Sequence, residues 1–147
     1  MSRLVITGAS ILNQATADIV IDSGKIVEVA KPGAADTFGA RVIDAAGLIA
    51  LPGFVDLHTH LREPGREDAE TVESGTRAAA LGGFTCVHAM ANTEPVADTA
   101  GVVEQVWRLG KEAGWCEVRP IGAVTVGLAG THMAELGAMA APAAQVR

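Results

Sequence analysis

The chain has 147 residues, 49% of them hydrophobic, and a formal net charge of −6 at pH 7. This hydrophobic content supports a packed core and excludes a disordered chain. The acidic balance, without a basic cluster, argues against nucleic acid or an anionic membrane as a partner. The sequence has neither the ~20 uninterrupted apolar residues of a membrane span nor the apolar run of a signal peptide, so we expect a cytoplasmic protein.

The first fifty residues predict a small β-domain. Short β-rich runs suggest strands over 4–7, 17–21, 25–29, 41–44 and 48–50. The first strand is expected to end at Gly8. The turn Asp22-Ser23-Gly24 is expected to join the second and third strands in a hairpin. The segment lacks a catalytic composition, and we interpret 1–50 as a small β-sandwich-like segment.

From Phe54 onward, predicted strands alternate with predicted helices. The strands cover 54–60, 84–90 and 118–124; the helices cover about 69–81, about 98–113 and a segment beginning near Thr131. Gly82-Gly83 and Gly114 are signals for helix ends. The apolar face of the second helix consists of Val102, Val103, Val106 and Leu109. Repeated β/α units with parallel strands favour a (β/α)8 barrel or a doubly wound sheet. The absence of Gly-x-Gly-x-x-Gly after the first strand weakens the dinucleotide-binding option.

The most informative segment is 51–65, Leu-Pro-Gly-Phe-Val-Asp-Leu-His-Thr-His-Leu-Arg-Glu-Pro-Gly. Two residues apart on a strand, His58 and His60 project to the same side, roughly 6.5–7 Å apart along the backbone. Two imidazoles at this spacing can bind one metal ion at about 2.0–2.1 Å. If the strand stays extended, Asp56 and Arg62 share their face, and the intervening apolar residues form a packing face. The alternative is a pair of partly buried histidines hydrogen-bonded to neighbours.

The wider sequence resembles the amidohydrolase superfamily, and its dihydroorotase branch in particular. The run 42–53 is similar to the approach to the metal-binding strand of that family, and 61–65 to its continuation. The run 89–95, Ala-Met-Ala-Asn-Thr-Glu-Pro, resembles the family's substrate-binding Asn motif, although Ala91 stands where many members have Pro. The resemblance implies an α/β fold. In it, 51–147 forms the first three β/α units of a metal-dependent (β/α)8 TIM barrel, and 1–50 precedes them as the β-domain.

The resemblance also implies roles for four residues. His58 and His60 would bind the more buried of two zinc ions, and Arg62 and Asn92 would hold the carboxylate of the substrate. A guanidinium offers a fixed fork of donors that suits a carboxylate. The alternatives are a surface ion pair of Arg62 with a neighbouring glutamate, and an Asn92 that caps its own backbone as a turn residue.

The implied activity is that of a dihydroorotase, the zinc-dependent, reversible hydrolysis of dihydroorotate to carbamoyl aspartate in pyrimidine biosynthesis. Possible partners are a second copy of the chain or aspartate transcarbamoylase. One alternative is an allantoinase or hydantoinase type of cyclic amidohydrolase. Arg62 with Asn92 favours a carboxylate-bearing substrate over allantoin. A second alternative is a non-catalytic dihydroorotase-like subunit of aspartate transcarbamoylase.

A complete (β/α)8 barrel takes about 250 residues, whereas 94 residues follow Gly53. We therefore expect an N-terminal fragment, inactive alone, whose remaining metal ligands and catalytic aspartate lie beyond residue 147. Asp56 is a candidate to orient a ligand histidine, with an ordinary buried hydrogen bond as the alternative. His88 is expected to be a core residue, and His132 a surface residue. Cys86 and Cys116 match no metal or redox spacing, and we expect both to be reduced and partly buried.

Overall fold

The computed structural model describes residues 3–140. The chain divides after Pro52 into two compact units, Met1–Pro52 and Gly53–Arg147. The first unit contains the strands predicted before Leu51, and the second contains the alternating strands and helices with the candidate site residues. No helix of the described part is long and apolar enough to cross a membrane.

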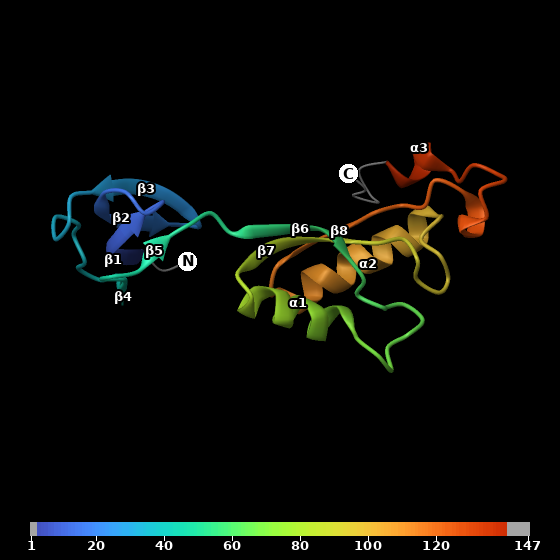
Figure 1. Ribbon diagram of the computed structural model, residues 1–147, viewed down its shortest axis with the longest axis horizontal. Helices are drawn as coiled ribbons and strands as arrows, with labels where there is room; N and C mark the ends of the chain where they lie inside the picture. The colour runs from blue at the N-terminus through green and yellow to red at the C-terminus, as the bar shows by residue number, and fades with distance from the viewer. Residues whose placement is uncertain (1–2, 141–147) are drawn as a thin grey trace. The chain divides into compact units, whose positions relative to one another are not determined.

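The first unit is built on a five-stranded sheet with the order β3-β2-β1-β4, in which β5 also pairs with β1 (Figure 1). Its strands are β1 (Leu4–Ile11), β2 (Thr16–Asp22), β3 (Lys25–Ala30), β4 (Arg41–Asp44) and β5 (Ile49–Ala50). The pairs β1–β2 and β2–β3 are antiparallel, whereas β4 and β5 run parallel to β1. Within the described residues of this unit the strands form one sheet.

One turn of this sheet agrees with the sequence-based prediction, and one predicted strand end does not. The predicted hairpin is confirmed: Ser23 and Gly24 join β2 to β3 with φ of 51° and 76°, the positive values of a two-residue hairpin turn. The predicted strand end at Gly8 is wrong, because β1 continues to Ile11. Its pairing with β2 shifts register between Ile6 and Ala9, and Gly8 takes a φ of 70°. The glycine therefore forms part of a β-bulge and does not end the strand.

The buried carboxylate of Asp18, on β2, forms hydrogen bonds to β1 and to the loop that follows β3. Asp18 is 1% exposed, and it accepts backbone N–H groups from Gly8 at 2.9 Å, Gly33 at 2.8 Å and Ala35 at 3.4 Å. The bond from Gly8 is the main cause that lowers the pKa of Asp18 below its ordinary value of 3.8. Asp18 thus joins the bulge of β1 to the loop that follows β3.

The second unit contains a three-stranded parallel sheet with the order β6-β7-β8 (Figure 1). Its elements in chain order are β6 (Phe54–Thr59), α1 (Val72–Leu81), β7 (Phe84–Ala89), α2 (Ala100–Ala113), β8 (Glu117–Pro120), the 3-10 helix η1 (Val126–Leu128) and α3 (Leu136–Met139). The first two predicted strands and the first two helices are confirmed. The third strand is confirmed in place but is shorter than predicted, because β8 ends at Pro120 and not at residue 124. α1 starts later than predicted because Thr71 caps it, accepting the N–H of Ser74 with its side chain.

The helix expected from Thr131 is wrong in position. The chain there turns back on itself: Thr125 forms an antiparallel bridge with Met133, and Ala134 donates its N–H to the carbonyl oxygen of Val124. Gly130, with a φ of 75°, permits this reversal. Helix therefore begins only at Leu136, in the short α3.

Both long helices pack against the parallel sheet. One core cluster joins residues from α1, α2, β7, β8 and the loop after β6: Leu61, Val72, Val87, Ala89, Val106 and Val118. A second cluster lies under the loops after β7 and β8: Ala91, Ala97, Val103, Ala123, Ala134 and Met139. Complete burial of one such aliphatic side chain stabilises the fold by about 1.5–3 kcal/mol. The predicted apolar face of α2 is confirmed, with Val103 and Val106 buried and its other members packed against these clusters.

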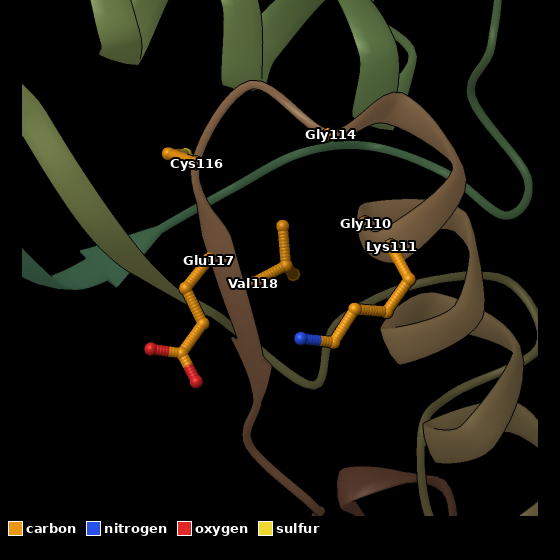
Figure 2. A pocket seen from close by; sticks show the side chains of 6 residues that line it. All are labelled: Gly110, Lys111, Gly114, Cys116, Glu117 and Val118. Atoms are coloured by element: carbon orange, nitrogen blue, oxygen red, sulfur yellow. The ribbon is translucent and has the colours of Figure 1, made fainter. Parts of the chain in front are cut away.

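The contact between α2 and β8 depends on a glycine, in a region that Figure 2 shows. A Cβ atom on Gly110 would lie 2.5 Å from the Cβ of Val118. The helix can therefore approach the strand this closely only without a side chain at residue 110. Gly114 then ends α2 with a φ of 67°, as its position in the sequence predicts.

Candidate metal and substrate site

The two predicted metal ligands meet at the carboxyl end of β6. His58 lies within the strand and His60 directly follows it. Their Nε2 atoms are 3.2 Å apart, and their ring planes are inclined by 64°. A tetrahedral ion that binds two nitrogens at about 2.0–2.1 Å separates them by roughly 3.3–3.4 Å. The two imidazoles thus converge with a spacing that fits a shared metal ion.

Asp56 holds the backbone of this strand. Its Oδ1 accepts the backbone N–H of His58 at 3.0 Å, and this bond is the main cause that lowers the pKa of Asp56. The expected contact with a histidine ring is therefore replaced by one with the main chain. The pairing of β6 with β7 shifts register between Asp56 and Thr59, so the regular alternation of faces ends there.

The apolar side chains expected to form a packing face are largely uncovered: Val55 is 52% and Leu57 68% exposed. The expectation that Arg62 continues the alternation of the strand is wrong. Arg62 has a φ of 63° and lies in the loop after β6. Leu61, just before it, is buried in the core cluster that also contains Val72 and Val106. The chain therefore leaves the extended conformation, and the position of Arg62 depends on the loop.

Arg62 and Asn92 are brought together in one cleft of about 420 Å³. Its lining is Arg62, Pro64, Arg66, Asn92, Thr93, Glu94 and Val96. Arg62 comes from the loop after β6 and Asn92 from the loop after β7, and the backbone N–H of Glu94 donates to the carbonyl oxygen of Pro64 at 2.9 Å. Loops at the carboxyl ends of parallel strands are where barrels and open α/β sheets place their sites.

Among the described residues, Arg62 does not form the alternative ion pair with a glutamate, and Asn92 does not cap its own backbone. The glutamates next to Arg62 contact main chain: Glu63 accepts the N–H of Val72 at 2.7 Å, and Glu67 accepts that of Gly65 at 2.9 Å. The side-chain oxygen of Asn92 lies 2.8 Å from Nδ1 of His60 and not against its own backbone. This contact joins residues 32 positions apart and was not predicted from the sequence.

The other histidines and the cysteines lie apart from this pair. His88 is half-buried with Nδ1 3.3 Å from the carbonyl oxygen of Asp56, and His132 is exposed. Both cysteines are free, and burial is the main cause that raises the pKa of the Cys86 and Cys116 thiols. Among residues 3–140, groups of three or more His, Cys, Asp or Glu side chains placed to hold a metal are absent.

A second cavity, of about 430 Å³, lies where α2 ends and β8 begins (Figure 2). Its lining is Gly110, Lys111, Gly114, Cys116, Glu117 and Val118. Because β8 begins here, this cavity lies at the amino end of that strand. None of the four predicted site residues lines it, so it is separate from the candidate site.

The sequence matches the family described as Dihydro-orotase-like over residues 47–145. The chain belongs to this family. Among curated proteins it is similar to the dihydroorotase of Streptomyces coelicolor, with 62% identity over 146 residues, 99% of this chain and 34% of that protein. It is 63% identical to the dihydroorotase of Leifsonia xyli subsp. xyli over 143 residues, covering 97% of this chain and 32% of the relative. The chain spans about a third of the length of these curated relatives.

Solved structures of hydrolases resemble this dihydro-orotase-like chain. The L-hydantoinase of Arthrobacter aurescens has a TM-score of 0.74 at 22% identity, over 85% of this chain and 28% of the hydantoinase. A D-hydantoinase has a TM-score of 0.62 at 26% identity, over 84% of this chain and 27% of that structure. These likenesses support the α/β fold described above.

Proposed function

We propose that this chain supplies the first metal-binding strand and the carboxylate-binding cleft of a dihydroorotase. The reaction is the reversible, zinc-dependent hydrolysis of dihydroorotate to carbamoyl aspartate. The observation that carries the proposal is the convergence of His58 and His60, with Nε2 atoms 3.2 Å apart, in a chain 62–63% identical to proteins named dihydroorotase. The hydantoinases are a weaker guide to the substrate because their identity is only 22–26%.

In this proposal His58 and His60 hold a zinc ion through Nε2. A bound zinc ion supplies acidified water and a polarised carbonyl, the two requirements of cyclic amide hydrolysis at neutral pH. Catalytic zinc sites have three protein ligands, so the proposal requires ligands beyond the two histidines and a second zinc ion in the intact site. It also assigns β6, β7 and β8 to the first three β/α units of a (β/α)8 barrel.

Arg62 and Asn92 bind the carboxylate of the substrate in this proposal. The guanidinium can form two parallel hydrogen bonds to a carboxylate, and the Asn92 amide group adds neutral donors. Both line the cleft beside the histidine pair. Arg66 and Glu94 also line it, and the Arg66 guanidinium is paired with Asp68 at 3.1 Å. A charge-recognising cleft favours dihydroorotate over allantoin, which has no carboxylate.

The test is zinc titration of the chain by calorimetry, with His58→Ala, His60→Ala and, as a matched control, His88→Ala. We expect each ligand variant to bind zinc at least about tenfold more weakly, which is about 1.4 kcal/mol. His88 lies on the neighbouring strand, and its variant should keep the affinity of the parent chain. Equal affinities for the parent and both ligand variants would refute the metal assignment.

A second titration tests the substrate class. Dihydroorotate, hydantoin and allantoin are added to the zinc-loaded chain while backbone amide shifts are followed by NMR. We expect dihydroorotate to shift residues around the cleft, and Arg62→Ala to abolish this response. Equal responses to the three compounds, unaffected by Arg62→Ala, would favour a hydantoinase type of enzyme.

A further inference from the structure

We propose that Asn92 is a positioning residue for the metal ligand His60, in addition to its role toward the substrate carboxylate. The inference rests on the proposed function and deepens it. One amide side chain would then connect the orientation of a metal ligand to recognition of the substrate.

The oxygen half faces the histidine. Asn92 Oδ1 lies 2.8 Å from Nδ1 of His60, a normal hydrogen-bond length. A carbonyl oxygen only accepts, so this contact places the ring proton of a neutral His60 on Nδ1. The lone pair is then on Nε2, the atom that faces Nε2 of His58 at 3.2 Å. Asn92 therefore selects the tautomer that can bind a metal there, as partners behind ligand histidines commonly do.

The nitrogen half of the same amide remains a donor. Because the group is planar, its nitrogen diverges from the oxygen that contacts His60, and Asn92 lines the cleft that also contains Arg62. A carboxylate there would meet both the guanidinium and this NH2 group. Anion binding and the orientation of His60 would then share one rigid side chain.

The loop that carries Asn92 is held by other contacts. Thr93 donates its hydroxyl to the carbonyl oxygen of Pro95 at 2.8 Å. The backbone of Glu94 donates to Pro64 at 2.9 Å, and that of Ala97 to Ala91 at 3.0 Å. The Asn92 side chain itself is exposed. Its removal should therefore spare the loop and remove chiefly the contact with His60.

The experiment compares Asn92→Ala, Asn92→Asp and, as a loop control, Thr93→Ala. Long-range 1H–15N NMR of the metal-free chain reports the tautomer of His60, and calorimetry reports zinc affinity. We expect the Nδ1–H tautomer in the parent chain and its loss in Asn92→Ala, with zinc bound about 10–100-fold more weakly. Asn92→Asp keeps an acceptor, so it should retain the Nδ1–H tautomer of His60. Its zinc affinity should be at least about one third of that of the parent chain. Thr93→Ala loses one contact of the loop but keeps the Asn92 amide, so it should keep the Nδ1–H tautomer and weaken zinc binding less than Asn92→Ala does.

Several results would overturn the inference: an Nε2–H tautomer of His60 in the parent chain, parental zinc affinity in Asn92→Ala, or equal weakening by Asn92→Asp and Asn92→Ala. Failure of the proposed function looks different. In that case His58→Ala binds zinc as well as the parent, whichever tautomer His60 has. The metal-free NMR measurement separates the two outcomes because it requires no zinc.

Discussion

Gly65 is the point at which the two loops of the candidate site approach each other. It has a φ of 108°, a backbone conformation that residues with side chains rarely adopt. A Cβ atom here would lie 2.5 Å from both the Cβ and the carbonyl oxygen of Glu94, against 3.4–4 Å for ordinary contact. In Gly65→Ala the two loops must therefore separate by about 1 Å, a displacement that can impair a site strongly.

Two costs add in this variant. Holding a non-glycine residue in such a conformation costs of order 1–3 kcal/mol, and overpacking costs typically about 1–3 kcal/mol. Since movement of the loops relieves part of the overlap, we expect the free energy of unfolding to fall by about 2–4 kcal/mol. The movement should also weaken the hydrogen bond between Glu94 and Pro64.

The assay is urea denaturation followed by tryptophan fluorescence, which reports on the second unit because both tryptophans, Trp107 and Trp115, belong to it. The matched control is Gly130→Ala: Gly130 has a φ of 75°, but nothing lies within 4 Å of a Cβ atom there. Gly130→Ala has backbone strain but no steric overlap. The free energy of unfolding should therefore fall by about 1–3 kcal/mol more in Gly65→Ala than in Gly130→Ala. Equal losses in the two variants would refute the close approach of the loops.

Three further predictions concern the rest of the chain. In α2, Gly101→Ala, where a Cβ atom meets nothing within 4 Å, should stabilise by up to about 1 kcal/mol, whereas Gly110→Ala should destabilise by about 1–2 kcal/mol in urea denaturation; stabilisation by both would contradict the packing of the helix on β8. Because the folded state lowers the pKa of Asp18, its stabilisation is complete above the ordinary value of 3.8 and is lost as pH falls through the lower folded value. Asp18→Asn should flatten this acid dependence in circular dichroism, and an unchanged acid transition would count against it. The raised thiol pKa of Cys86 and Cys116 predicts slower alkylation by iodoacetamide at pH 8 than for free cysteine, measured by mass spectrometry, and labelling as fast as free cysteine would be the opposite result.

Local signals in the sequence predicted what local physics decides. Gly24 in the hairpin turn and Gly114 at the end of α2 both adopt positive φ, which glycine does without steric cost. The spacing of His58 and His60 predicts that their side chains meet, and they do so although His60 lies just beyond β6 and the regular alternation ends before it.

Features set by distant parts of the chain were not predicted. The bulge at Gly8 depends on the pairing with β2 and on the carboxylate of Asp18. The late start of α3 depends on pairing between Thr125 and Met133. The contact of Asn92 with His60 arises because β6 and β7 are adjacent and parallel. A signal was present in that case, since His60 ends one predicted strand and Asn92 follows the next one.

The decisive measurement is X-ray absorption at the zinc edge of the zinc-loaded chain and of His58→Ala. We expect two imidazole nitrogens at about 2.0–2.1 Å from zinc in the parent chain. In the variant we expect one, with water in place of the lost ligand. A zinc environment without imidazole, or one unchanged by His58→Ala, would contradict the assignment of this strand as a metal-binding strand.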